Sequence, residues 1–339
     1  MAKPRVIIST DIGGADPDDM ESMAHALLVA DQWDIKGLVS TPTKHGGRAS
    51  DIHKAIDAYT KDYGNLKTWS SDYPTPDYLK GIVTQGNVNV APSAGYSYST
   101  AGSKAIVKAA HEAKSAGEPL WVLTWGALTD VAQALHDDPS IRPTLRVLYS
   151  DAWNGEQDPN ANKYVLENHV PKGLWIIDNN STFRGIYINS EGKEGNPFQM
   201  SQVKGHGELG DYFYESRPWG VKMGDSWTIA YLTDKANDHN PGADSWGGTY
   251  VKTGKGPNYW TDDTSKGEKI AWYNGANHIR DHQEVIYKDM YRLFDRAKSP
   301  NPNADKDASA DSGGGTTSPP PAPAPDTSSG TGNAVYAVD

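Results

Sequence analysis

The stretch that decides the fold is RVIISTDIGGADPDDMESMAHALLVA, residues 5–30. Its first part, residues 5–10, is a short run rich in β-branched side chains, which predicts a buried strand. Residues 17–30 then place apolar side chains at helical spacing, at Met20, Met23, Ala24, Leu27 and Leu28. Gly13 and Gly14 lie between the two segments and allow a tight turn. The stretch therefore predicts a strand, a tight turn and a helix.

The turn between strand and helix is acidic. Five carboxylates fall within eleven residues, namely Asp11, Asp16, Asp18, Asp19 and Glu21. Helix capping and the helix dipole account for the acids at the helix start. They do not account for Asp11, which ends the buried strand. Converging carboxylates repel one another unless they share a cation, and oxygen-only ligation suits Ca²⁺ or Mg²⁺. Two interpretations stay open here, a divalent-metal site and a capped, solvated helix start.

Strands and helices continue to alternate along the chain. Further strands are expected at 35–41, 120–125, 145–150 and 174–178, and further helices at 48–63, 103–116, 128–136 and 281–298. Repeated strand–helix–strand units predict an α/β fold, a Rossmann-like, mostly parallel sheet with helices on both faces. In such sheets a ligand lies beyond the carboxyl ends of the strands, which is where Asp11 is expected.

Composition limits the classes of partner. The chain has 339 residues with a formal net charge of −11, so we expect neither nucleic acid nor an anionic membrane as a partner. It has no cysteine, which excludes disulfides, thiolate metal sites and a cysteine nucleophile. Its 11 Trp and 18 Tyr against 4 Phe suit a wet, sugar-like ligand, or equally an aromatic-rich core.

The C-terminal part of the chain differs from the rest. From residue 299 onward Pro, Gly and Ser dominate, so residues 299–332 are expected to be a disordered linker. We expect one folded domain at 4–298 and the start of a truncated further module at 333–339. No signal-peptide pattern opens the chain, yet linkers of this composition are typical of secreted glycan-active proteins. We therefore expect an extracellular or periplasmic location.

Several other motifs are incomplete. Gly13 and Gly14 do not supply a dinucleotide fingerprint, and no phosphate-binding P-loop sequence occurs. Residues 224–228 lack the last glycine of a nucleophile elbow. His278 and His282 stand four residues apart near the last predicted helix, without the glutamate of a zinc protease between them. We interpret this pair as helix surface rather than a metal site.

Residues 5–41 resemble the nucleoside-hydrolase-like domain of bacterial cellulose-binding proteins, a distant relative of the calcium-dependent nucleoside hydrolases. The resemblance rests on the strand, DIGG, DPDD, the helix and GLVST in that order. It recurs at PLWVLTWG (119–126), KMGDSW (222–227) and DSWGGTY (244–250). It covers roughly residues 4–298.

The resemblance implies a Ca²⁺ site, position by position. It implies that Asp11 is the general base and a Ca²⁺ ligand, that Asp19 and Asp225 are further carboxylate ligands, and that Trp125 binds the ion through its backbone carbonyl. It implies that Asp18 binds sugar hydroxyls, although one extra residue before it leaves Asp16 as an alternative.

Further substrate contacts are expected from the residues themselves. Asn154, Asn162 and Asn179 are candidates for binding sugar hydroxyls, and Trp153 for stacking on a sugar ring, with loop or core roles as the alternative.

Together with these residues, the resemblance implies a Ca²⁺-dependent hydrolase of a glycosidic bond in a carbohydrate. Asp11 would take a proton from the attacking water, and the anomeric configuration would invert. The alternatives are a non-catalytic carbohydrate (cellulose)-binding domain and a ribonucleoside hydrolase. Gly224 stands where some nucleoside hydrolases carry a leaving-group histidine, which argues against the last. The resemblance also carries the expectation of a homodimer.

The acid that would protonate the leaving group stays open. Its candidates are Glu156, Glu167, His169 and His239.

Overall fold

The computed structural model describes residues 3–14, 17–43, 47–187, 200–216, 220–234, 238–269 and 276–304. The chain divides into two compact units, residues 1–301 and 302–339, and all the elements below belong to the first. Of the expected linker at 299–332, only residues 299–304 are described, and the expected segment 333–339 lies outside the described residues.

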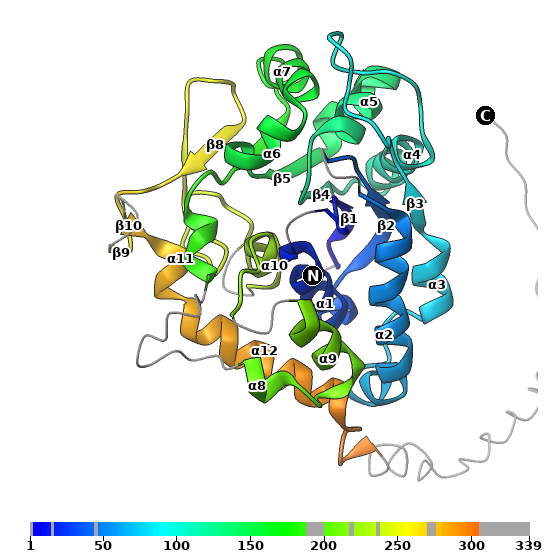
Figure 1. Ribbon diagram of the computed structural model, residues 1–339. Helices are drawn as coiled ribbons and strands as arrows, with labels where there is room; N and C mark the ends of the chain where they lie inside the picture. The colour runs from blue at the N-terminus through cyan, green and yellow to red at the C-terminus, as the bar shows by residue number, and fades with distance from the viewer. Residues whose placement is uncertain are drawn as a thin grey trace, which may run out of the picture. The chain divides into compact units, whose positions relative to one another are not determined.

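Among the described residues, an eight-stranded sheet forms the centre of the first unit (Figure 1), in the order β3-β2-β1-β4-β5-β6-β8-β7. Its strands are β1 (Arg5–Thr10), β2 (Asp34–Ser40), β3 (Val83–Gln85), β4 (Leu120–Thr124), β5 (Leu145–Tyr149), β6 (Trp175–Asp178), β7 (Tyr250–Lys252) and β8 (Tyr259–Asp262). Neighbouring strands are parallel except for β7 and β8. The prediction of a mostly parallel α/β fold is confirmed.

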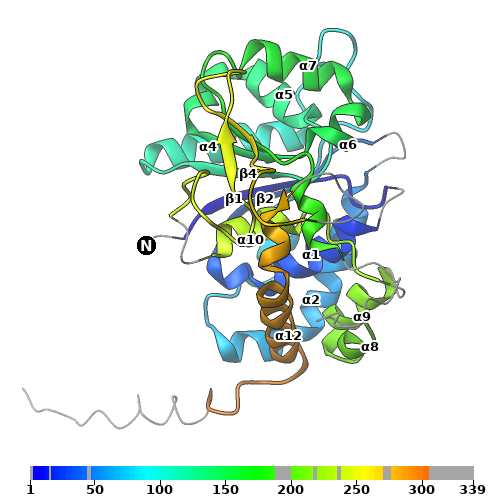
Figure 2. The ribbon, with the colours of Figure 1, turned by 90° about the vertical axis from the view of Figure 1, so that its left-hand side faces the viewer.

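Helices cover both faces of this sheet (Figure 2). One face carries α4 (Ala101–Ser115), α5 (Thr129–Asp137) and α7 (Pro159–Asn168). The other carries α1 (Asp18–Leu28), α2 (Ala49–Trp69), α9 (Gly207–Ser216), α10 (Ser226–Thr233) and α12 (Gln283–Lys298). Shorter elements are α3 (Pro76–Gly81), α6 (Asp151–Gln157), α8 (Met200–Val203), α11 (His278–Asp281) and the two-stranded pair β9 (Glu268–Lys269) and β10 (Ala276–Asn277).

Strand β1 is covered by helices on both faces, which explains why its sequence does not alternate between apolar and polar residues. Its side chains point in turn to the two faces of the sheet, so Val6 and Ile8 enter the core beneath α1 and α2, and Ile7 enters the core beneath α4 and α5. A strand that is covered on both faces needs apolar side chains on both, which is what residues 5–10 supply.

The strand order sets the place of a ligand site. After β1 the chain moves outward through β2 and β3, then returns to pair β4 with the other edge of β1. Where the order reverses, the loops after β1 and β4 diverge and leave a crevice at the carboxyl edge of the sheet. Ser9 pairs with Thr124 at this edge, so Asp11 and Trp125, which follow β1 and β4, lie at the same rim.

The end of the described chain differs from the prediction. The last long helix begins at Gln283, not at residue 281, and a separate turn of helix, α11, precedes it. His282 lies between the two helices. Within the described residues, no helix has the length and hydropathy that crossing a membrane would require.

Candidate active site

A cavity of about 290 Å³ lies at the carboxyl edge of the sheet. Four of the residues that line it are aspartates, namely Asp11, Asp18, Asp19 and Asp225. Asp11 follows β1, Asp18 and Asp19 open α1, and Asp225 directly precedes α10. Oxygen atoms of Asp18, Asp19 and Asp225 lie within 4.8 Å of one another, and the carboxyl of Asp11 contacts that of Asp19. The fold thus gathers four carboxylates, which we call the carboxylate cluster.

The carboxylate cluster is electrostatically unbalanced. Burial and the charges of neighbouring acids raise the pKa of Asp18, Asp19 and Asp225 well above the usual value. Burial, with a contribution from the charge of Asp18, raises the pKa of Asp11 to about 7. The ammonium of Lys222 lies 3.9 Å from Asp18 Oδ2, and burial lowers the pKa of this lysine. One ammonium does not neutralise four carboxylates.

The donor set suits a hard divalent cation. Asp225 Oδ2 is buried and has no hydrogen-bond partner among the described residues, although other carboxylates surround it. A buried acceptor without a partner is costly, and a cation between the carboxylates would remove that cost. All the side-chain donors in the carboxylate cluster are oxygens, which favours Ca²⁺ or Mg²⁺ over Zn²⁺. The carboxylate cluster is therefore a potential metal site.

The turn after β1 holds Asp11 and Asp19 in place. The N–H of Gly14 donates to the carbonyl of Asp11 at 3.0 Å, and the hydroxyl of Thr10 donates to Asp19 Oδ1. Gly13 has φ +87°, and a Cβ there would fall 2.2 Å from an oxygen of Asp51. The turn therefore requires glycine at this position.

Glu21 joins the two distant parts of the site. It is fully buried on α1, and its Oε2 accepts hydrogen bonds from the N–H groups of Lys222 at 2.8 Å and Met223 at 2.6 Å. The hydroxyl of Ser226 donates to that of Ser22 on α1 at 3.1 Å. The helix that carries Asp18 and Asp19 thus also anchors the segment before Asp225, although the two segments are 201 residues apart. No local sequence pattern indicates this role, because Glu21 Oε2 accepts from backbone groups of a distant segment.

The four residues expected to contact a sugar divide into two groups. Trp153 and Asn154 on α6 line the cavity, and Trp153 is 57% exposed. Asn162 and Asn179 are not among the residues that line it. Asn162 bridges Asp151 and Tyr149, and the amide of Asn179 bonds Tyr250, Thr182 and the N–H of Phe183. Both asparagines hold loops together instead.

Trp125 lines the cavity but is almost fully buried, and its indole N–H donates to Thr228 at 2.9 Å. Its carbonyl accepts the amide of Asn154 at 3.2 Å. A carbonyl oxygen has two lone pairs, so this bond leaves room for a cation as a second partner. The ring of Trp125 belongs to the core rather than to a stacking platform.

None of the four expected proton donors lines the cavity. Glu156 and Glu167 are exposed elsewhere, His169 bonds Arg142, and His239 lies against Trp121. Asp16, the alternative to Asp18, lies outside the described residues.

The cavity also has lining residues that the sequence did not point to, among them Gln157, Arg184, Tyr187 and Lys222. The guanidinium of Arg184 lies 4.4 Å from the ring of Phe183. Attention to every loop that follows a predicted strand would have included Arg184, because it comes soon after β6.

Comparison with known proteins agrees with this architecture. The sequence model of the family described as cellulose-binding Sde182, nucleoside hydrolase-like domain, matches residues 5–250. A nucleoside hydrolase-related hypothetical protein from Saccharophagus degradans, associated with carbohydrate metabolism, is similar in structure, with a TM-score of 0.69. It is 24% identical, over 89% of this chain and 74% of that chain.

An inosine-uridine preferring nucleoside hydrolase from Bacillus anthracis has a TM-score of 0.51 and 16% identity, over 87% of this chain and 100% of that chain. At these identities the two structures support the fold alone. Among curated protein sequences, none matches the chain.

Proposed function

The chain belongs to the family of cellulose-binding Sde182, nucleoside hydrolase-like domains, and on that premise we propose that it is a Ca²⁺-dependent hydrolase of a glycosidic bond in a carbohydrate. The observation that carries the proposal is the carboxylate cluster around the unpartnered oxygen of Asp225. The family description names cellulose, and the similar protein from Saccharophagus degradans is associated with carbohydrate metabolism. Both favour a carbohydrate as the partner.

Asp11, Asp19 and Asp225 would hold the ion through carboxylate oxygens, and Trp125 through its backbone carbonyl. When bound, Ca²⁺ would orient sugar hydroxyls and make a water easier to deprotonate. It would also bring the acids of the carboxylate cluster to their charged form at neutral pH, because a nearby positive charge lowers a carboxyl pKa.

The side chains of the chain would perform the remaining steps. Asp11 would accept the proton of the attacking water, since it lines the open cavity together with the other carboxylates of the cluster. Asp18 would accept hydrogen bonds from sugar hydroxyls. The negative charge of the carboxylate cluster would stabilise the positive charge that develops on the sugar ring in the transition state. Direct attack of water predicts inversion of the anomeric configuration.

Trp153 and Asn154 also line the cavity and would contact the sugar there. Trp153 offers an exposed ring at the mouth of the cavity, which suits the apolar face of a sugar. Asn154 supplies amide groups for hydroxyls. For the chain as a whole, we propose a domain at 4–298 followed by a linker at 299–332 and a further module from 333. We also propose an extracellular or periplasmic location and a homodimer.

The decisive experiment compares the unmodified protein with Asp11→Asn on plant and algal polysaccharides in millimolar Ca²⁺. We expect new reducing ends from the unmodified protein, no turnover from the variant, and sugar affinity in both. Proton NMR of the first product would report its anomeric configuration. Turnover that survives both chelation and Asp11→Asn would contradict the proposal.

A second candidate function is non-catalytic carbohydrate binding. It is favoured by one observation, the absence of all four expected proton donors from the cavity wall. It predicts sugar affinity without turnover in the unmodified protein, so the same experiment separates the two functions. A ribonucleoside hydrolase would instead release free base from inosine or uridine, and Gly224 in place of the leaving-group histidine argues against that activity.

A further inference from the structure

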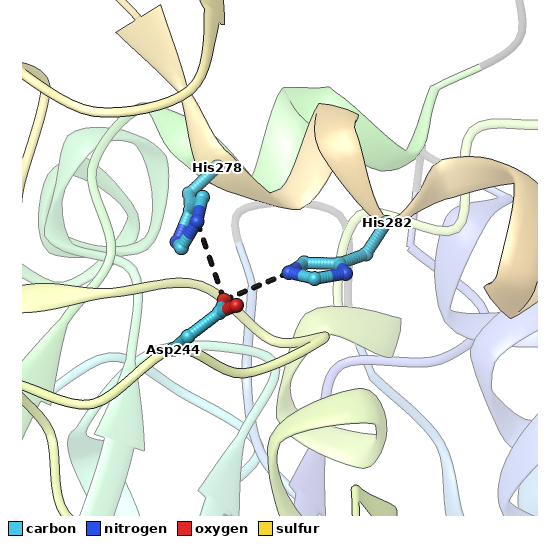
Figure 3. A group of neighbouring side chains, drawn as sticks. All are labelled: Asp244, His278 and His282. Atoms are coloured by element: carbon cyan, nitrogen blue, oxygen red, sulfur yellow. Dashed lines mark hydrogen bonds and ion pairs between the residues drawn. The ribbon is translucent and has the colours of Figure 1, made fainter.

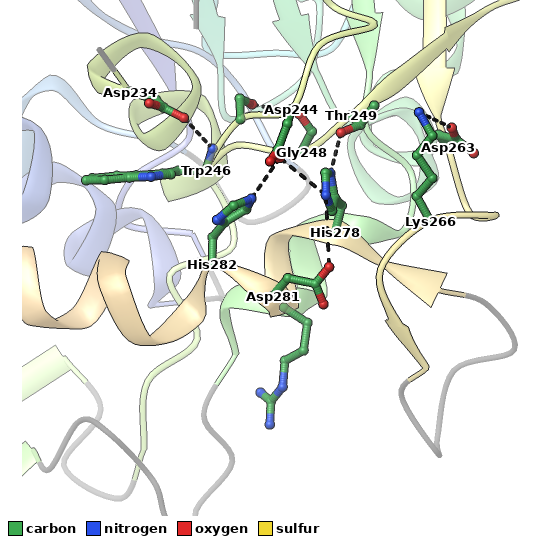
Figure 4. A network of polar contacts seen from close by, with 12 residues as sticks. Asp234, Asp244, Trp246, Gly248, Thr249, Asp263, Lys266, His278, Asp281 and His282 are labelled. Atoms are coloured by element: carbon green, nitrogen blue, oxygen red, sulfur yellow. Dashed lines mark hydrogen bonds and ion pairs between the residues drawn. The ribbon is translucent and has the colours of Figure 1, made fainter. Parts of the chain in front are cut away.

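A second group of metal-ligand side chains lies outside the cavity (Figures 3 and 4). Asp244 comes from the loop before β7, His278 begins α11, and His282 directly follows that helix. Each offers one ligand atom, and these atoms all lie within 4.8 Å of one another. In the part of the chain that the structure describes, this is the only such group that contains histidine. We call it the histidine cluster.

The two rings converge on one oxygen. Nε2 of His282 lies 2.8 Å from Asp244 Oδ1, and Nε2 of His278 lies 3.2 Å from the same atom (Figure 3). The two histidines are four residues apart, so one helical turn brings both rings to the same side. Ligands that share a tetrahedral ion at about 2.0–2.1 Å lie about 3.3 Å apart. The spacing in the histidine cluster is close to that of a metal site.

The orientation of His278 has a cause outside the histidine cluster. Its Nδ1 contacts the hydroxyl of Thr249, which is buried, and this contact turns Nε2 toward Asp244 (Figure 4). Histidines that bind metals commonly use the second ring nitrogen for such a hydrogen bond. Asp281 Oδ2 lies 3.9 Å from His278 Nε2 and adds a second negative charge beside the rings. Two carboxylates beside two imidazoles favour a cation at this position.

We propose that the histidine cluster binds a divalent transition-metal ion, with Zn²⁺ as its best match. Two imidazole nitrogens and one carboxylate oxygen are a common donor set for Zn²⁺, whereas Ca²⁺ prefers oxygen alone. Asp244 is 62% exposed, so water can complete the coordination shell. The ion would bind independently of the carboxylate cluster and of any sugar.

The ion would join two parts of the fold. Asp244 lies in the segment that continues through Trp246, whose N–H donates to Asp234 at 2.9 Å beside the end of α10. His278 and His282 lie at the start of the helical pair α11 and α12. Binding would therefore link the loop before β7 to the last helices, which is a structural role.

The alternative is that the same contacts are only hydrogen bonds and ion pairs. His282→Gln separates the two, because a glutamine amide can donate to Asp244 but is a poor ligand for Zn²⁺. Asp244→Asn removes the carboxylate. His111 supplies a matched control, because its Nε2 lies 2.7 Å from Asp138 Oδ2 in a surface pair that lacks a second histidine.

The experiment uses the full chain, freed of metal with a chelator and returned to millimolar Ca²⁺ so that the carboxylate cluster is filled. Co²⁺ is then titrated and followed by its visible absorption, and Zn²⁺ is added as a competitor. We expect one equivalent of Co²⁺ to bind and Zn²⁺ to displace it. His282→Gln and Asp244→Asn should weaken binding by at least about 100-fold, which exceeds the loss typical of a residue one step removed from the metal.

Two further variants test whether the loss of binding is specific to the histidine cluster. His111→Gln should bind like the unmodified protein. Thr249→Val should weaken binding by about tenfold, because it removes only the hydroxyl that orients His278. A chain that takes up no Co²⁺ would overturn the proposal, as would binding that persists unchanged in both His282→Gln and Asp244→Asn. Circular dichroism of each variant would establish that it is folded.

Discussion

The carboxylate cluster and the histidine cluster differ in burial and in how far their polar atoms are already paired. In the first, four acids meet in a cavity, and Asp225 Oδ2 has no hydrogen-bond partner among the described residues. In the second, Asp244 lies at the surface, and both rings already bond its carboxylate. A cation would remove a cost of burial in the first group, whereas in the second the polar contacts are already made without one.

The comparison therefore predicts different ions and different consequences of their loss. A hard cation should change the stability of the chain strongly and in a pH-dependent way through the carboxylate cluster. A borderline cation should bind the histidine cluster, where the contacts are made without it, and should change the stability less.

The largest expected effect comes from Asp225→Asn. We expect Ca²⁺ affinity to fall by at least about 100-fold, since the change removes a carboxylate from the carboxylate cluster. The metal-free variant should melt at a higher temperature than the metal-free unmodified protein, because it carries one less buried charge. Zn²⁺ binding should not change.

Isothermal titration calorimetry and thermal denaturation with and without Ca²⁺ would measure these effects. Asp57→Asn, which alters an exposed carboxylate on α2, is the control. Unchanged Ca²⁺ affinity in Asp225→Asn would remove Asp225 from the metal site.

The pH dependence of stability gives the second effect. The pKa of Asp11 is about 7 in the folded chain and about 3.9 when unfolded, so the folded chain keeps protons that the unfolded chain loses. Stability of the metal-free protein should therefore fall as the pH rises from 5 to 7.5, by about 1.4 kcal/mol per pH unit for each such proton. Ca²⁺ should reverse this trend, because it binds the charged form.

Urea denaturation at several pH values, with chelator and with Ca²⁺, would test this prediction. Burial also raises the pKa of Asp130 and of Asp178 to about 6. Subtracting the stabilities measured with chelator from those measured with Ca²⁺ at each pH therefore leaves the contribution of the carboxylate cluster. Parallel curves with and without Ca²⁺ would show that the raised pKa values have another origin.

Glu21→Gln should have a smaller effect. The amide keeps the shape of the side chain but loses the charge that two backbone N–H groups share, at a cost of about 1.5–3 kcal/mol. Ca²⁺ affinity should fall by about tenfold, as for other residues that orient metal ligands.

Asp62→Asn is the matched control for Glu21→Gln. Asp62 also accepts two backbone N–H groups, those of Glu208 and Leu209 at 2.9 and 2.8 Å, but at the start of α9 and away from the cavity. It should lower stability and leave Ca²⁺ affinity unchanged. Equal Ca²⁺ affinities in Glu21→Gln and Asp62→Asn would show that the anchoring of the segment before Asp225 by Glu21 does not contribute to metal binding.

The smallest effect is expected from Trp153→Ala. Loss of a ring that stacks on a sugar should weaken carbohydrate affinity by about three- to tenfold, and Ca²⁺ affinity should not change. Affinity electrophoresis in gels that contain soluble polysaccharide would measure it. Tyr98→Ala is the control, because Tyr98 is 62% exposed and does not line the cavity. A similar loss in both variants would place sugar binding elsewhere.

The sequence predicted the structure correctly where the pattern within one short segment determines the local secondary structure. Residues 5–30 predicted β1, the glycine turn and α1, because their periodicity changes from strand to helix within one stretch. The resemblance added Asp225, which no local pattern connects to Asp11. The structure brings these residues into one cavity.

The sequence was uninformative where the partner lies far away or is backbone. The orientation of Asn162 and Asn179 depends on side chains of other elements, so their residue type alone suggested sugar contacts. The histidine cluster was missed for the same reason, since Asp244 comes from a separate loop and the helix breaks at His282. The anchoring role of Glu21 could be recognised only from the position of the Lys222 and Met223 backbone.

Gly224 leaves space for one carboxylate of the carboxylate cluster. A Cβ at this position would fall 2.3 Å from Asp18 Oδ2, so any larger residue would displace that carboxylate. A histidine in place of Gly224 would therefore change the position of Asp18 as well as the chemistry of the cavity. Because Asp18 Oδ2 ends a short side chain, a rotation of the Asp18 side chain would relieve the contact but would also take its carboxylate out of its present place in the cavity.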